Sequence, residues 1–120
     1  KNVTKEIITY FESKIDKLHQ LGFYKIVIDP GFGFGKTLEH NYEILNNLDK
    51  FECLKYPILV GVSRKSMIYK VLDTDATHSL NGTSVINTLS LKNGASILRV
   101  HDVKEAVECI KIVNFAKNNC

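Results

Sequence analysis

The chain has 120 residues, of which 44% are hydrophobic and 24% are charged, and such values are typical of one packed globular domain. The formal net charge of +3 comes from lysines spread along the whole length, and this argues against nucleic acid as a partner, because binding to nucleic acid needs clustered basic residues. No stretch approaches the roughly 20 apolar residues that span a bilayer, so no membrane partner is expected.

The three cysteines, Cys53, Cys109 and Cys120, are odd in number and far apart. They show neither a disulfide framework nor the ligand spacing of a zinc site. The pattern indicates reduced thiols in the cytoplasm and predicts no metal ligand within the chain.

The first expected element is an amphipathic helix over residues 2–21, whose apolar residues recur at helical spacing and which ends at Gly22. A β-branched run over residues 24–28 then predicts a buried strand. This strand must stop at Asp29, because a proline and a glycine follow.

The same order recurs twice along the chain. A helical pattern over residues 42–48 precedes a predicted strand over 57–62. A short helix over 67–72 and a longer one over 85–94 precede a third strand over 95–100. Asp102 is expected to cap the last helix, with Glu105 three residues on as in a capping box.

Apolar strands that alternate with helices are typical of parallel sheets covered by helices, so the predicted fold class is α/β. Because crossover connections are right-handed, the three strands should run parallel and their following loops should emerge at one rim. Ligands bind at that rim in barrels and open sheets alike. We therefore expect one pocket to be formed by the polar residues at the strand ends, which are Asp29, Ser63, Lys65, Arg99 and His101.

The glycine-rich loop over residues 31–35 matches no nucleotide motif, because Pro30 and Lys36 stand where a P-loop and a dinucleotide fingerprint need glycine. One interpretation is a simple turn. Phe32 and Phe34 favour another, in which they form a wall for a flat ring. We therefore expect a planar aromatic ligand.

Two positions at the rim suit anions. Ser63 is expected to cap a helix start whose free N–H groups hold a carboxylate, while Lys65 donates to a ring atom; the alternative is a solvated helix start. Arg99 and His101 lie on the same side of a strand and both can donate to phosphate. The alternative there is that Arg99 pairs with a neighbouring carboxylate such as Asp102 and that backbone atoms satisfy His101.

Three rim sequences, DPGFGFGK at 29–36, GVSRKS at 61–66 and RVHD at 99–102, resemble in order and separation those of the dihydropteroate synthase family. Residues 40–42 and 81–83 resemble that family too. The resemblance covers essentially the whole chain. It implies the C-terminal three βα units of a TIM (β/α)8 barrel, with residues 1–120 forming part of a pterin-binding domain whose first five strands are absent.

The resemblance implies a transferase of folate biosynthesis that joins dihydropterin pyrophosphate to 4-aminobenzoate and releases pyrophosphate. Mg²⁺ would assist through ligands in the missing N-terminal part. The implied catalytic residues are Lys65, Arg99 and His101, with Lys65 on the pterin ring carbonyl or nitrogen side and the other two on pyrophosphate.

The remaining implied substrate-binding residues have distinct places. Asp29 would bind the amino-pyrimidine edge of the pterin, and Phe34 with Ser63 would border the aminobenzoate. Gly33 and Arg64 complete the expected set.

The resemblance also implies a homodimer for the full-length enzyme, and we expect the chain alone to be inactive. Three strands cannot close an eight-stranded barrel, so the chain should belong to a longer protein or associate with itself. One alternative is the methyltetrahydrofolate-binding domain of a corrinoid methyltransferase, which would use Asp29 alike but is disfavoured by Lys65, Arg99 and His101. The other is a non-catalytic pterin-binding fragment.

Overall fold

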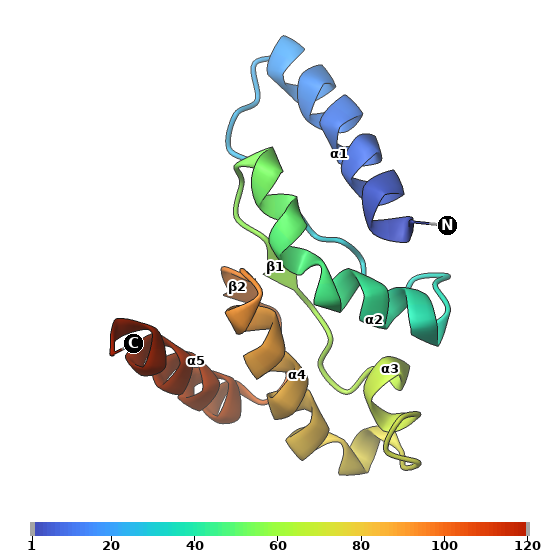
Figure 1. Cartoon of the computed structure of the whole chain (residues 1–120), viewed down its shortest axis with the longest axis vertical. Coiled ribbons are helices and arrows are strands. Elements are labelled where there is room, and N and C mark those ends of the chain that lie inside the picture. Colours follow the sequence, from blue (N-terminus) through green and yellow to red (C-terminus); the bar gives the residue numbers. More distant parts are fainter. Residues whose placement is uncertain (1, 120) are drawn as a thin grey trace.

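The computed structural model describes residues 2–119, so Cys120 lies outside the described residues. Helices surround a small central sheet, and the chain begins at α1 and ends at α5, on opposite sides of the view (Figure 1). The elements in chain order are α1 (Val3–Gln20), α2 (Leu38–Asn46), the 3-10 helix η1 (Leu48–Leu54), β1 (Leu59–Val60), α3 (Ser66–Tyr69), the 3-10 helix η2 (Ala76–His78), α4 (Leu80–Lys92), β2 (Ile97–Leu98) and α5 (Val103–Asn118).

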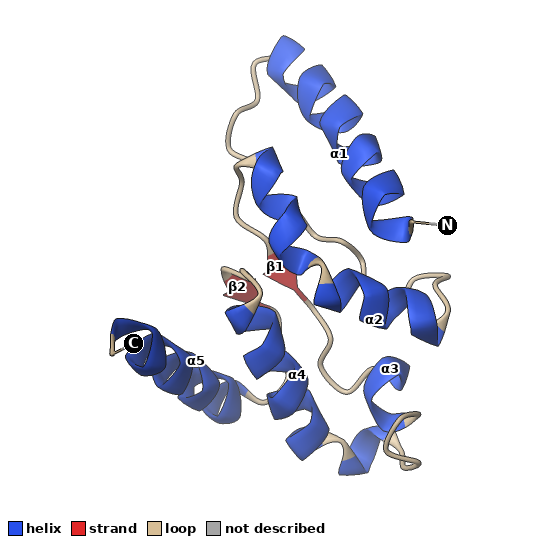
Figure 2. Cartoon of the chain, in the orientation of Figure 1, coloured by secondary structure: helices blue, strands red, loops and turns tan. Residues whose placement is uncertain are grey.

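The sheet is parallel, as predicted. β1 pairs with β2 through Leu59 with Ile97 and Val60 with Leu98, and Ile28 forms a parallel bridge with Ile58. The strands lie between the α1 and α2 layer and the α4 and α5 layer (Figure 2). Because all three segments run the same way, the loops that follow them emerge at one rim.

The first predicted strand, over residues 24–28, is wrong except at Ile28. The Ile28 N–H donates to the Pro57 carbonyl, and the Leu59 N–H donates to the Ile28 carbonyl. The next donors of this parallel ladder would be the nitrogens of Pro57 and Pro30, and proline has no N–H. The chain's two prolines thus limit the pairing to one bridge. The other two strands are also shorter than predicted.

Two polar caps start the first two helices. The Asn2 side chain accepts the Lys5 N–H at 3.0 Å, and the Thr37 hydroxyl accepts the His40 N–H at 3.0 Å. Such caps satisfy N–H groups that have no partner within the helix. The helices α1 and α2 contact each other, and both contact η1.

The main core lies between these helices and the strands. Ten of its apolar side chains are at most 2% exposed, namely Ile28, Phe32, Ile44, Leu45, Leu48, Phe51, Val60, Val62, Met67 and Ile68. The sequence prediction missed η1, although Leu48, Phe51 and Leu54 recur at the spacing of three that buries one face of a 3-10 helix. A second, smaller cluster joins α4 to α5 through Leu91, Cys109 and Val113.

The predicted capping box of the last helix is wrong. Asp102 precedes α5, but its side chain makes no cap hydrogen bond. Its carboxylate instead accepts two bonds from the Arg64 guanidinium, at 3.0 and 3.2 Å. A paired, charge-assisted contact of this kind is stronger than a single bond to a backbone N–H.

Candidate functional site at the carboxyl ends of the strands

The structure brings the predicted rim residues together. A hollow of about 120 Å³, here called the rim pocket, is lined by Gly61, Ser63, Lys65, Arg99, Val100 and His101. Asp29 adjoins it through Arg99. The residues come from loops after the three parallel segments, which is where α/β folds bind ligands.

Asp29 and Arg99 join the first and third segments. One Asp29 carboxylate oxygen accepts the Gly31 N–H at 2.9 Å, and the other accepts Arg99 Nη1 at 3.2 Å. Arg99 therefore pairs with a carboxylate, as the alternative expects, but with that of Asp29 rather than that of Asp102. The Arg99 side chain is 54% exposed and that of Asp29 is 37% exposed, so both charged groups remain accessible to a ligand.

Lys65 is tied to the glycine-rich loop. Its Nζ donates to the Phe32 carbonyl at 2.7 Å and lies 4.8 Å from the centroid of the Phe34 ring. Burial lowers the pKa of Lys65, the positive charges of Arg99 and Lys36 lower it further, and the negative charge of Asp29 opposes them. The Lys65 amine therefore lies in an electrostatic environment to which a bound anion would add negative charge.

Ser63 holds the imidazole of His101. The Ser63 hydroxyl lies 2.8 Å from His101 Nδ1 and accepts the His101 N–H at 3.3 Å. The expectation that Ser63 caps a helix is wrong, because α3 is preceded by Lys65 as its N-cap residue and has no side-chain cap. The bond at Nδ1 orients the ring and leaves Nε2 as the nitrogen available to a ligand.

Arg64 ties the loop after β1 to two other segments. Besides its bonds to Asp102, its guanidinium donates to the carbonyls of Ala76 and Thr77 at 2.8 and 3.0 Å. The bond to Asp102 raises the pKa of Arg64. Its backbone adopts φ 56°, a conformation that is unusual for a residue other than glycine. Arg64 does not line the rim pocket, so a direct contact with substrate stays a prediction.

The glycine-rich loop separates its two phenylalanines. Phe32 is 1% exposed and fills the core, whereas Phe34 is 70% exposed, so the expectation that both form a wall for a ligand is wrong for Phe32. The Gly33 N–H donates to the side chain of buried Asn41 at 2.8 Å, at φ 90°. This bond holds the loop shape, and a substrate contact by Gly33 stays a prediction.

Three supporting residues were missed as such from the sequence. Asn41 holds the glycine-rich loop, and the Thr83 hydroxyl accepts the Arg64 N–H at 3.1 Å. Asn41 and Thr83 both belong to segments that resemble the family, and this resemblance was the sequence signal that could have identified them. Gly61 lines the rim pocket directly after β1.

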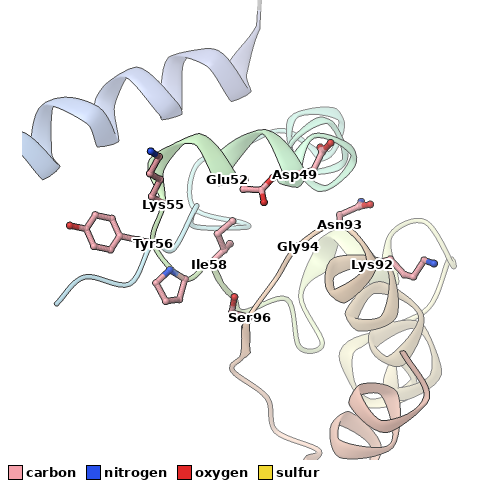
Figure 3. Close-up of a pocket in the computed structure, with 10 residues that line it drawn as sticks. Asp49, Glu52, Lys55, Tyr56, Ile58, Lys92, Asn93, Gly94 and Ser96 are labelled. Carbon is pink, nitrogen blue, oxygen red and sulfur yellow. The ribbon is translucent and has the colours of Figure 1, made fainter. Parts of the chain in front are cut away.

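A larger hollow, of about 510 Å³, lies at the opposite ends of the strands (Figure 3). Its lining comes from η1, from the residues that enter β1 and β2, and from the end of α4: Asp49, Glu52, Lys55, Tyr56, Pro57, Ile58, Lys92, Asn93, Gly94 and Ser96. None of the predicted site residues lines it. Since ligands of such folds bind after the strands rather than before them, the rim pocket is the candidate site.

Within residues 2–119 no three His, Cys, Asp or Glu side chains gather in a way that could hold a metal ion. No helix in this described part is long and apolar enough to cross a membrane.

A family model described as pterin binding enzyme matches residues 1–101. The chain belongs to the family of pterin-binding enzymes. It is 43% identical over 114 residues to the dihydropteroate synthase of Escherichia coli, an alignment that covers 93% of this chain and 40% of that protein. The chain thus spans about two fifths of the length of that curated relative.

Solved structures agree with this family membership. The dihydropteroate synthase of Yersinia pestis, solved in complex with a sulfonamide drug, aligns with a TM-score of 0.95 at 37% identity, covering 98% of this chain and 44% of that one. The enzyme from Thermus thermophilus, in complex with 4-aminobenzoate, aligns with a TM-score of 0.90 at 34% identity, covering 95% and 47%. The fold of this chain is therefore part of a (β/α)8 barrel, as predicted.

Proposed function

We propose that this chain is the C-terminal part of a dihydropteroate synthase, with residues 1–120 forming part of its pterin-binding barrel domain. The observation that carries the proposal is the meeting of Lys65, Arg99 and His101 in one pocket, with Asp29 bound to Arg99. The family match and the relatives named dihydropteroate synthase support it.

The proposed substrates are dihydropterin pyrophosphate and 4-aminobenzoate. Asp29 binds the amino-pyrimidine edge of the pterin and Lys65 its carbonyl or nitrogen side. Exposed Phe34 and the region of Ser63 border the aminobenzoate. Asp29 is a hydrogen-bond acceptor and faces the edge of the pterin that offers N–H donors, whereas Lys65 can donate to the ring carbonyl or nitrogen. Arg99 and His101 can donate to the negatively charged pyrophosphate.

In the proposed reaction the bond from the pterin methylene carbon to the pyrophosphate oxygen breaks. The departing electron pair stays on pyrophosphate, where Arg99 and Nε2 of His101 stabilise the growing charge. The neutral amine of 4-aminobenzoate forms the new C–N bond and loses one proton. Both substrates are positioned by the rim, so no covalent bond to the protein is needed.

Mg²⁺ is implied by the resemblance and would add positive charge at the pyrophosphate. The residues described here do not provide a three-ligand site for it. We therefore assign no metal ligand in this chain and no reaction step to the ion. We further propose that the full-length enzyme is a homodimer in the cytoplasm and that this chain alone is inactive.

Asp29→Ala tests the pterin assignment in a protein that carries the complete barrel. It should weaken pterin binding by on the order of 2–4 kcal/mol, because a charge-assisted partner is lost. Calorimetric titration with a pterin measures this, and Asp49→Ala, at the opposite ends of the strands, is the matched control. Unchanged affinity would remove Asp29 from the site.

Arg99→Ala should instead lower the affinity for pyrophosphate and the turnover while sparing a pterin that lacks phosphate. Lys92→Ala, far from the rim, should spare both ligands. Equal losses for both ligands in Arg99→Ala would contradict the division of roles. Pterin binding that is independent of pyrophosphate would favour the methyltetrahydrofolate-binding alternative.

A further inference from the structure

Gly61 stands directly after β1, under the guanidinium of Arg99. A Cβ atom placed on Gly61 would lie 2.7 Å from Arg99 Cζ and 2.9 Å from Arg99 Nε, with Nη2 closer still. All three nearest atoms belong to this one guanidinium. Carbon atoms pack at about 3.5–4.0 Å, so a side chain at this position and the observed place of the guanidinium exclude each other.

The backbone of Gly61 does not itself require glycine. Its φ lies outside the left-handed region, unlike that of Gly31 or Gly33. An alanine would therefore be compatible with the backbone conformation. The contact with Arg99 is the structural reason for having no side chain here.

Arg99 can give way only at its distal end. Its backbone N–H donates to the Val60 carbonyl at 3.0 Å, which holds its Cα beside β1, and the two strands lie side by side (Figure 1). The guanidinium would have to leave Gly61. Its Nη1 donates to Asp29 at 3.2 Å, at the upper end of the usual range, so such a movement alters this contact.

We propose that Gly61 is a positioning residue for anion binding: its missing side chain makes the space in which the Arg99 guanidinium lies, beside Asp29 and in the pocket that His101 also lines. The ligand group concerned is the pyrophosphate of the substrate, so the inference rests on the proposed function for its catalytic meaning. The placement of Arg99 by Gly61 can be tested without any substrate.

The chain has only two arginines, Arg64 and Arg99, which makes their guanidinium NMR signals a direct readout in the 120-residue protein. Gly61→Ala should move the Arg99 signals, because the guanidinium must leave its observed place. Asp29→Asn, which removes the ion pair, is the reference variant in which these signals should also move. The Arg64 signals, held by Asp102, are the internal control and should stay in place. Arg99 signals that remain at their wild-type positions in Gly61→Ala would overturn the proposal.

Titration with inorganic pyrophosphate tests the consequence. Gly61→Ala should lower the affinity about tenfold, comparable to the loss of one charge-assisted contact, and should have no further effect when Arg99→Ala is already present. The thermal unfolding midpoint should change little, because the displaced group is the exposed end of a flexible side chain. An equal loss with and without Arg99 would mean that Gly61 acts by another route and would also overturn the proposal.

The two proposals fail differently. If the wild-type chain and Gly61→Ala both bind no pyrophosphate while the Arg99 signals move, the placement by Gly61 stands and the anion-binding role of this pocket fails. If pyrophosphate binds equally to both and the signals do not move, the placement fails and the anion site stands.

Discussion

Lys65 is a rim residue whose pKa is lowered by burial and shifted further by its charged neighbours. Its pKa lies below the ordinary value of lysine because the amine is partly buried and faces Arg99 and Lys36, while Asp29 acts in the opposite direction. The direction in which each neighbour shifts the pKa of Lys65 can therefore be predicted. The same charges would orient a substrate that carries pyrophosphate on one end and a hydrogen-bonding ring on the other.

Removing these neighbours should move the pKa of Lys65 in opposite directions. Asp29→Asn should lower it, because a stabilising negative charge is lost, and Arg99→Ala should raise it, because a repelling positive charge is lost. NMR titration of the Lys65 side chain measures both. Asp49→Asn, at the other ends of the strands, should leave it unchanged; a rise in Asp29→Asn would contradict the geometry.

The lowered pKa of Lys65 also predicts how its contribution to stability depends on pH. Between its folded-state pKa and the higher unfolded-state pKa, the unfolded chain binds more protons, so the free energy of unfolding rises with pH in that window. Lys65→Met should remove this part of the rise. Denaturant unfolding across the alkaline range measures it, and Lys92→Met serves as control. An unchanged pH profile in Lys65→Met would refute the prediction.

At the level of elements, α4 supports the loop that carries Ser63 and Lys65. Buried Thr83 accepts the Arg64 N–H, and its own hydroxyl donates to the Ser79 carbonyl at 2.7 Å. One hydroxyl thus joins the loop after β1 to the first turn of the helix. Because Arg64 has a left-handed backbone conformation, the loop depends on such fixed partners.

Thr83→Val removes that hydroxyl while keeping the shape of the side chain. It should lower the free energy of unfolding by about 1–3 kcal/mol, because the partly buried N–H of Arg64 loses its partner. Thr83→Ser, which keeps the hydroxyl, should cost less. Thr88→Val, which loses only a bond to the Ser84 carbonyl within the same helix, should also cost less. Denaturant unfolding measures these changes. Equal losses of unfolding free energy in Thr83→Val and Thr88→Val would show that the bond from the loop to Thr83 adds nothing to stability.

On the scale of the whole molecule, the segment leading to Ile28 exposes a row of apolar side chains. Leu21, Phe23, Tyr24 and Val27 are 51 to 71% exposed, and the backbone between them lacks strand pairing. Exposed apolar surface beside unpaired strand edges favours association. This is the structural basis for expecting the chain to associate with itself or to pack against further strands.

The isolated 120-residue chain should therefore sediment as more than a monomer at micromolar concentration and bind hydrophobic dyes. Phe23→Lys with Val27→Lys should shift it toward the monomer, because the added charges oppose the burial of this segment. Ser13→Lys with Gln20→Lys, at two exposed polar positions in the preceding helix, is the charge-matched control. A compact monomer that binds no dye would contradict the expectation.

The order of the α-helices and of the two paired strands, the parallel direction of the sheet and the gathering of Asp29, Lys65, Arg99 and His101 at one rim were predictable from the sequence. Helical spacing, β-branched runs and turn residues are local signals, and the handedness of crossovers converts their order into a common rim. The three motifs at strand ends then pointed to the pterin-binding family.

Only the tertiary structure decided which polar groups pair at that rim. Ser63 bonds His101 across 38 residues, Arg64 bonds Asp102 across 38, and Asp29 bonds Arg99 across 70. A local pattern contains no information on such distant partners. The side chains of Ser63 and Asp102 therefore bond to these partners and do not cap helices as predicted. The burial of Phe32, the truncation of the first strand and the space above Gly61 likewise follow from packing between segments, which is set only when the chain is folded.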